Sequence, residues 1–573
     1  MAMKRNLLSI LTYKLAFNKF SHTWSPLAAV FNSKPTQKIN LNVLKNNKGL
    51  FDVPELQSHE GFYALKERCI IQTDQLIQEA TSKNRSRKMV EIFDELSDTL
   101  CKVADLAEFI RIAHPSGAYS KAAEIACVTV SSIVEKLNTN YELYAALKNV
   151  VDNGDIMNTT DVDKHVARLF LFDFEQCGIH LPESERRQVV ELNDAILHLG
   201  QHFVTGTAKP RTIQRKCLSE EIRRLFQVDG DNLLIYSLYA DSNDPIAREF
   251  AYRIFLHPDK HQEYLLMKLL SCRNELAQTC GFQTYSERAL KGSLAECPEV
   301  VSRFLDMLSD ALRPRVEEDF KEMSRIKLNE CGPNFGNVAA WDVPYFSQKV
   351  KRDIFRVASN EYAPYFSLGA CMEGLDLLMK SLYGVSFVHT ELTAGESWSM
   401  DVYKLAVTHE SEGLLGYIYC DLYERAGKPN QDCHFTIQGG KELAGGSYQL
   451  PVVVLMLNLP IPRWSSPSLL SPGMVDNLFH EMGHAMHSML ARTKYQHVTV
   501  IRGYSTCFEE DPLNRQRGDR YRHECLAHGG GKPPRQLVGD FLQREVTPTK
   551  LVDSLVKEID EKTRQVRHVE AVS

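Results

Sequence analysis

The sequence predicts a mainly α fold with a small β-sheet beside a helix that carries a His-Glu-x-x-His motif. Three observations lead to this prediction: helical spacing of apolar residues over most of 55–319, strand-like segments between residues 414 and 459, and a further helical pattern over 471–490. With 573 residues, the chain is long enough to bury a large core and to form two or more lobes.

The amino-terminal segment differs in composition from the rest of the chain. No acidic residue occurs before Asp52, and apolar side chains between residues 7 and 17 form an amphipathic pattern with lysines. A basic, amphipathic and acid-free segment is typical of a mitochondrial transit peptide, and the interruption at Tyr13-Lys14 argues against a secretory signal. We therefore predict a transit peptide over residues 1–35, removed somewhere between residues 20 and 40. A disordered basic tail is the alternative.

Residues 36–330 form a predicted helical N-terminal region. The spacing of apolar residues predicts helices over 88–110, 120–137, 183–203 and 299–312. Polar breaks such as Asp229-Gly230-Asp231 separate the helical segments at no fixed period, so we do not expect a solenoid of identical repeats. The run Cys331-Gly332-Pro333 predicts the end of this region, and residues 331–573 form the second one.

Three strand-like segments, 414–422, 433–437 and 449–459, predict a small sheet in the second region. Glycine pairs at 439–440 and 445–446 bracket the turn between the last two strands. A free strand edge beside an active site can pair with an extended peptide and hold it in place. Purely structural strands are an equally good interpretation of the same pattern.

The helix predicted over 471–490 begins with Ser471 as N-cap and Pro472 in its first turn. Within it, His480 and His484 are four residues apart, so both imidazoles lie on one face of the helix and can reach one zinc ion. Glu481 is then placed to act as a general base toward water. The alternative is a pair of core histidines that share this spacing by chance.

Two neighbouring residues of the same helix are further candidates for the site. Asp476 lies one turn before His480 and could orient a metal ligand, but a solvated charge is the simpler interpretation. His487 continues the face one turn beyond His484, and we do not assign it as a ligand.

Composition narrows the class of protein further. The apolar content of 43% and the charged content of 24% are those of a soluble globular protein, and a net charge of −6 gives no indication of a nucleic-acid partner. No apolar run reaches the roughly 18 residues that span a bilayer. The 14 cysteines show no paired spacing, which favours reduced, buried thiols in an intracellular compartment.

Several long segments resemble the thimet-oligopeptidase family of zinc metallopeptidases, in particular its mitochondrial members. The resemblance runs from about residue 24 to residue 499, and its most specific segments are 93–98 (Phe-Asp-Glu-Leu-Ser-Asp), 365–375, 413–421, 431–437 and 449–499. It implies a two-lobed helical ellipsoid with a deep substrate channel and one zinc ion on the channel floor.

The resemblance also implies a function. It suggests a metalloendopeptidase of the mitochondrial matrix that removes N-terminal octapeptides from imported precursor proteins. Its partners would be peptide and precursor-protein substrates, and we expect a monomer. A narrow channel would admit flexible N-terminal segments and exclude folded proteins.

The chain departs from the family pattern after Thr499. In relatives the third zinc ligand is a glutamate in a Phe-x-Glu-x-Pro-Ser context on a second helix, followed by a tyrosine-rich loop that contacts substrate. Here the residues from Cys507 onward resemble the extreme C-terminal region of the family instead. The sequence therefore predicts an internal deletion with its join between Thr499 and Cys507, and Tyr504 is the one nearby candidate to replace the tyrosine loop.

Two carboxylates can be considered as the third zinc ligand. Glu509 lies at nearly the family spacing from His480, and we assign it as the predicted ligand. Glu510 is the alternative, because Phe508, Glu510 and Pro512 imitate the context of the family's ligand. If neither completes the site, the chain is instead a catalytically inactive peptide-binding or unstable variant, since catalytic zinc sites normally use three protein ligands.

Overall fold

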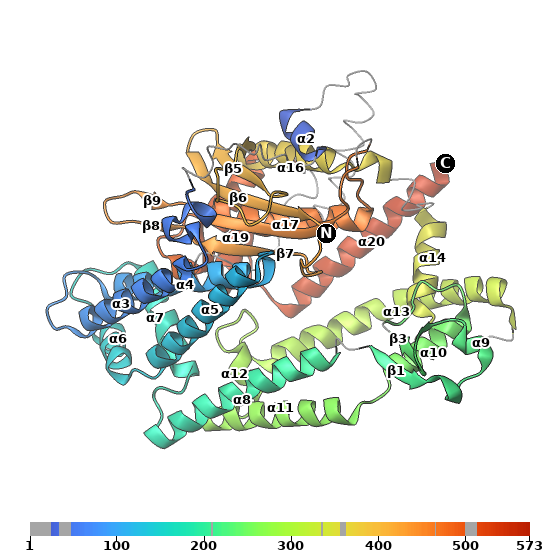
Figure 1. Cartoon of the computed structure of the whole chain (residues 1–573), viewed down its shortest axis with the longest axis horizontal. Helices are drawn as coiled ribbons and strands as arrows, with labels where there is room; N and C mark the ends of the chain where they lie inside the picture. Colours follow the sequence, from blue (N-terminus) through green and yellow to red (C-terminus); the bar gives the residue numbers. More distant parts are fainter. Residues whose placement is uncertain are drawn as a thin grey trace. The chain divides into compact units, whose positions relative to one another are not determined.

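The computed structural model describes residues 25–33, 47–207, 210–235, 237–333, 336–355, 363–463, 466–498 and 513–572 (Figure 1). Helices make up most of this part of the chain, which confirms the prediction of a mainly α fold. Its contacts divide it into two compact units, Met1–Glu175 with Ser359–Arg544 and Gln176–Ala358 with Glu545–Ser573. This division differs from the regions 36–330 and 331–573, which stay a prediction about sequence organisation.

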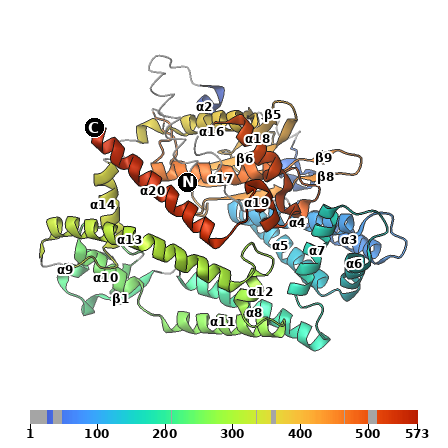
Figure 2. The same cartoon turned by 180° about the vertical axis from the view of Figure 1, so that it is seen from behind.

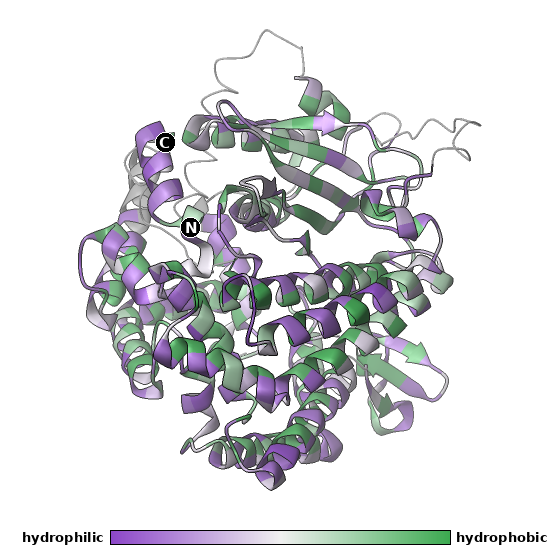
Figure 3. Ribbon diagram, turned by 90° about the vertical axis from the view of Figure 1, so that its left-hand side faces the viewer, coloured by the Kyte–Doolittle hydropathy of each residue, from purple (hydrophilic) through white to green (hydrophobic). Residues whose placement is uncertain are grey.

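The first unit begins with helices that precede its sheet. They are α2 (Pro26–Phe31), α3 (Gly61–Thr81), α4 (Met89–Ala113), α5 (Gly117–Asn138), α6 (Tyr141–Asn153) and α7 (Asp161–Gln176), with the 3₁₀ turns η2 (Leu50–Asp52) and η3 (Pro54–Gln57). Figure 3 shows hydrophobic and hydrophilic residues mixed along the helices of the chain, as expected for helices with one apolar face. Helices α4 and α5 agree with the segments predicted over 88–110 and 120–137.

The main sheet of the first unit has five strands. They are β4 (Val385–Thr390), β5 (Tyr403–His409), β6 (Gly413–Tyr423), β7 (Cys433–Gln438) and β10 (Val452–Leu459), in the order β4-β5-β6-β10-β7. Strand β10 runs parallel to β6 and the other pairs are antiparallel. Strand β7 is therefore an edge strand. Three strands were predicted from the sequence, whereas β4, β5 and the short hairpin β8 (Lys441–Glu442) and β9 (Tyr448–Gln449) were not.

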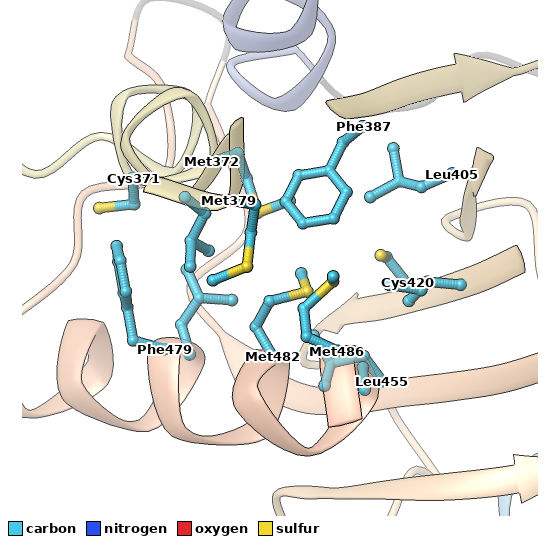
Figure 4. Close-up of a cluster of buried hydrophobic side chains, with 14 of the residues drawn as sticks. Cys371, Met372, Met379, Phe387, Leu405, Cys420, Leu455, Phe479, Met482 and Met486 are labelled. Carbon is cyan, nitrogen blue, oxygen red and sulfur yellow. The ribbon is translucent and has the colours of Figure 1, made fainter. Parts of the chain in front are cut away.

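Two helices, α16 (Leu368–Tyr383) and α17 (Pro472–Leu490), pack with the sheet around a large hydrophobic cluster. Figure 4 shows Met372 and Met379 of α16 and Met482 and Met486 of α17 converging between the two helices and the strands. Flexible methionine side chains fill the irregular space where two helices meet a twisted sheet. The remaining C-terminal elements of this unit are η7 (Gln496–Val498), α18 (Arg515–Glu524), η8 (Leu526–Gly531) and α19 (Pro534–Leu542).

A buried charge cluster joins β6 to the rest of the sheet. Asp421 of β6 is 0% exposed and accepts hydrogen bonds from the indole nitrogen of Trp398 at 2.9 Å and from Lys428 Nζ at 2.9 Å. Arg425 also pairs with this carboxylate, and Lys428 Nζ reaches the carbonyl oxygen of Leu457 on β10 at 2.5 Å. One carboxylate therefore balances two cations, of which Lys428 also connects β6 to β10.

The second unit contains long helices and a separate small sheet. Its helices are α8 (Glu183–Thr207), α9 (Glu220–Arg223), α10 (Pro245–Phe255), α11 (Lys260–Thr279), α12 (Tyr285–Leu290), α13 (Pro298–Cys331), α14 (Val343–Phe355) and α20 (Pro548–Val572). Figure 2 shows these elements from behind. Helix α13 ends at Cys331, and Gly332 follows it as the C-cap with a φ of 80°. The boundary between two regions at residues 331–333 stays a prediction.

The small sheet of the second unit was not predicted, since the sequence indicates an overwhelmingly helical pattern over 55–319. Strands β1 (Arg211–Gln214), β2 (Gln227–Asp229) and β3 (Asn232–Ile235) form it in the order β1-β3-β2. The polar break at Asp229-Gly230-Asp231 is the turn of its antiparallel hairpin, where Gly230 has a φ of 57°. Strands of three or four residues are too short to produce a recognisable alternation in the sequence.

Candidate active site

Helix α17 forms where the sequence predicts it, and for the predicted reasons. The side chain of Ser471 accepts a hydrogen bond from the backbone N–H of Met474 at 3.4 Å, and Pro472 occupies the first turn. One face of the helix is fully buried and packs against β10, β7 and β6; its members include Leu478, Met482, Ala485 and Met489. The His-Glu-x-x-His residues lie on the opposite side of the helix or at the margin of this buried face, directly beside the edge strand β7.

The two histidines of the motif point at the same place. The Nε2 atoms of His480 and His484 are 3.1 Å apart, and their rings are perpendicular within a degree, with centroids 4.7 Å apart. Two imidazole nitrogens bound to one tetrahedral zinc ion at about 2.05 Å would be separated by about 3.3 Å. The positions of these two nitrogens therefore fit a shared zinc ion with little rearrangement.

Glu481 lies beside this pair but faces a more enclosed environment. The residue is 8% exposed, and the backbone N–H of His434 on β7 donates a hydrogen bond to its carboxylate. Burial raises the pKa of Glu481, and the nearby carboxylate of Asp432 acts in the same direction, while His480 opposes the shift. A carboxylate that is held by its neighbours and made more basic by burial is suited to accept a proton.

A third imidazole, which the sequence prediction missed, lies at this site. The ring of His434 stacks on the ring of His484, with centroids 4.9 Å apart and planes at 14°. Its Nδ1 atom is 4.0 Å from Oε2 of Glu481. Burial lowers the pKa of His434 to about 4, helped by repulsion from the histidines of α17, so the ring is neutral at pH 7. His434 thus touches both a motif histidine and the motif glutamate.

Three of the other candidate residues, Glu509, Glu510 and Tyr504, lie outside the described residues. Among the residues that the structure does describe, no third histidine, cysteine, aspartate or glutamate joins His480 and His484 in a group suited to hold a metal ion. The assignment of Glu509, or of Glu510 in its place, therefore stays a prediction. His487 is half-buried, and burial lowers its pKa to about 4.

The chain that follows α17 is fixed by two carboxylates from the helical part of the same unit. The backbone N–H of His497 donates to Asp94 at 3.0 Å, and Asp163 accepts from Lys494 at 2.9 Å and from the Tyr495 hydroxyl at 2.8 Å. Asp94 belongs to the segment 93–98 that carries part of the family resemblance. This segment thus has a structural role, since it anchors the chain that leaves the motif helix.

A cavity of about 1020 Å³ opens elsewhere along the same edge strand. Ile437 and Gln438, at the end of β7 away from His434, form part of its wall, together with residues of α3, α4 and the β8–β9 hairpin. Within it, Lys441 pairs with Asp98 at 2.9 Å. The edge of β7 therefore leads from the histidine cluster to a hollow with charged walls.

Comparison with known proteins places this site in a family. Residues 238–503 match peptidase family M3. The mitochondrial intermediate peptidase of Pongo abelii is 49% identical over 504 residues, which cover 88% of this chain and 70% of that protein. The chain belongs to peptidase family M3. It is therefore a metallopeptidase, and the family implies a metal cofactor.

Two further relatives carry the same name. The mitochondrial intermediate peptidase of Homo sapiens is 49% identical over 495 residues, covering 86% of this chain and 69% of the relative. The one from Arabidopsis thaliana is 31% identical over 538 residues, covering 88% and 74%. These matches confirm the resemblance stated from the sequence. The match to the M3 family ends at residue 503, inside the interval 499–507 where the sequence predicts a join.

We expect replacement of His434 by alanine to weaken zinc binding about 10-fold, because the ring that packs against His484 and approaches Glu481 would be lost. His434→Phe is the matched variant, since it keeps an aromatic ring for stacking but removes the polar contact with Glu481. Zinc affinity is measured by competition with a coloured chelator. Phenylalanine should restore most of the affinity, and unchanged affinity in the alanine variant would show that the stacked ring has no influence on the metal site.

Proposed function

We propose that this chain is a zinc metalloendopeptidase that removes N-terminal octapeptides from precursor proteins imported into mitochondria. The observation that carries the proposal is the convergence of His480 Nε2 and His484 Nε2 to 3.1 Å beside the buried carboxylate of Glu481. The name that these relatives share supports peptidase activity and the mitochondrial location. The basic, acid-free segment before Asp52 supports the same location.

His480 and His484 would hold one zinc ion per chain, with Glu509 as the third ligand and Glu510 as the alternative. Zinc at such a site supplies Lewis acidity toward the scissile carbonyl and makes water a stronger acid. Glu481 takes the proton of the attacking water and delivers it to the leaving amine of the substrate. The ring of His434 stacks on His484 and limits its rotation. His434 also limits the movement of the Glu481 side chain on the side that faces β7.

The edge strand β7 gives this site a means to bind a peptide. Its backbone pairs with β10 along one side, and no other described strand pairs with it. An extended substrate can add to the free side by main-chain hydrogen bonds, which would bring a peptide bond past His434 toward Glu481. Recognition of this kind uses backbone groups and suits N-terminal segments of varied sequence.

The proposed function includes a cellular location and an oligomeric state. We place it in the mitochondrial matrix, where an imported precursor first exposes its N-terminal segment, and we expect it to act as a monomer. No helix among the described residues combines the length and the apolar character needed to cross a membrane. Peptides and precursor proteins are its proposed partners.

The proposal is tested by incubating the purified chain with a precursor that begins with a processing octapeptide. We expect a product eight residues shorter, identified by intact mass, and no change in a matched precursor that lacks the octapeptide. Cleavage at scattered positions in both precursors would support a general peptidase and contradict octapeptide removal. Absence of any cleavage would favour the second candidate function.

That second candidate is a protein that binds peptides without cutting them. It is favoured by one observation, namely that the sequence departs from the family pattern after Thr499, where relatives carry the third zinc ligand. The edge of β7 and the neighbouring cavity would be kept in such a protein, so binding of the precursor would be measurable by calorimetry while its mass stays unchanged.

A further inference from the structure

Helix α2 lies within the segment predicted as a transit peptide, yet its residues are part of the folded core. Leu27, Ala28 and Phe31 are buried, and both Ala28 and Phe31 have an exposed fraction of 0%. Leu27 and Phe31 belong to the same hydrophobic cluster as the inner faces of α16 and the main sheet. A segment that is cut off and discarded has no reason to fill the core of the protein that remains.

Aromatic and polar contacts hold α2 in place. The ring of Phe31 packs on the ring of Tyr403, with centroids 4.4 Å apart. The hydroxyl of Tyr403 donates to the carbonyl oxygen of Ser33 at 2.6 Å and lies 2.9 Å from the hydroxyl of Tyr423. Removal of residues 25–33 would leave these buried hydroxyls without that acceptor.

Helix α16 is shaped to receive α2, which lies beside it in both views of the molecule (Figures 1 and 2). The backbone N–H of Gly369 donates to the side-chain oxygen of Asn32 at 3.0 Å. A Cβ atom at Gly369 would lie 2.2 Å from the carbonyl oxygen of Ala28, so only glycine allows the two helices to approach this closely. The receiving helix therefore fits α2 at the level of its backbone.

The start of α2 is also well defined. The side chain of Ser25 accepts a hydrogen bond from the backbone N–H of Ala28 at 3.1 Å, and Pro26 occupies the first turn. A Ser-Pro pair at these two positions is a regular helix start. The folded element thus includes Ser25 as its N-cap, and a cut between Ser25 and Phe31 would destroy it.

We infer that residues 25–33 remain in the mature protein, so that leader removal takes place at a peptide bond before Ser25. The cut is a hydrolysis in which water gives a hydroxyl to the new carboxyl end of the leader and a proton to the new amino end of the mature chain. The processing step rests on the proposed import into mitochondria, whereas the retention of α2 rests on its packing alone. The predicted leader, residues 1–35, would then be shorter by at least eleven residues.

The processing step is tested by importing the full-length chain into isolated mitochondria and sequencing the N-terminus of the protease-protected product by mass spectrometry. We expect the first residue to be Ser25 or an earlier one. A product that begins after Ser25 would overturn the inference. If no protected product forms, the proposed import fails, and the packing of α2 is then decided by a second measurement on the purified full-length chain.

That second measurement compares Phe31→Ala with Ala29→Ser, which changes the exposed face of the same helix. If α2 is an integral part of the fold, Phe31→Ala lowers the melting temperature by about 5–10 °C or prevents recovery of folded protein, while Ala29→Ser leaves it unchanged. Equal melting temperatures for Phe31→Ala and the unmodified chain would overturn the retention of α2.

Discussion

Replacement of Glu481 by glutamine is expected to abolish precursor cleavage. Glutamine has nearly the same shape and can occupy the pocket between α17 and His434, but it cannot take a proton from water. Loss of a positioned general base typically lowers turnover by about 10²–10⁴-fold. The measurement is the initial rate of octapeptide removal at saturating precursor, compared between the unmodified chain and the variant.

Two controls make this result specific to the chemistry. Zinc content and melting temperature of Glu481→Gln should equal those of the unmodified chain, because the motif histidines and the buried face of α17 are untouched. Glu424→Gln changes an exposed glutamate just beyond β6 and should leave the rate unchanged. A Glu481→Gln variant that still cleaves at the original rate would exclude Glu481 as the base. If the unmodified chain does not cleave either, the peptide-binding function gains support.

The largest expected effect on stability comes from Asp421→Asn. The carboxylate of Asp421 is fully buried and balances Lys428 and Arg425, and the variant would leave these two cations without their counter-charge. Breaking a buried charge pair in this way typically costs about 3–5 kcal/mol of folding free energy. The measurement is chemical unfolding followed by circular dichroism.

Asp74→Asn is the matched control, since Asp74 is exposed on α3 and its replacement should change stability by less than about 0.5 kcal/mol. His434 lies on β7, which β10 separates from Asp421 on β6, so Asp421→Asn should leave the metal affinity of the folded protein unchanged. An unfolding free energy equal to that of the control would show that Lys428 and Arg425 are neutralised by other groups.

The parts of the fold that the sequence predicts are those with strong local signals. The N-cap Ser471, the proline that follows and the 3.6-residue spacing are sufficient to place α17. Short strands carry no such signal, so the sequence predicts a helical region where β1, β2 and β3 occur. Helix α13 was predicted to end near residue 312, but it continues to Cys331 with Pro314 in its interior. Helical signals resume after this proline, and the sequence offers no way to see that the two parts are continuous.

The residues of the candidate site could likewise be predicted only in part. The motif residues His480, Glu481 and His484 are close in sequence, so a helical spacing predicts that they lie together. His434 lies on a different element and reaches the site only because α17 packs against the edge strand β7. Its one signal in the sequence is its position at the start of a predicted strand, which precedes the motif helix. The third ligand depends on the segment after Thr499, and Glu509 remains a prediction.

The zinc content of the purified chain after exhaustive dialysis tests the central claim most directly. Measured by elemental mass spectrometry, it should be close to one zinc ion per chain, and it should fall to near zero in a His480→Ala variant that remains folded. Separate replacement of Glu509 and Glu510 by glutamine would then identify the third ligand. A folded, unmodified chain with far less than one zinc ion would contradict the account of this protein as a zinc endopeptidase.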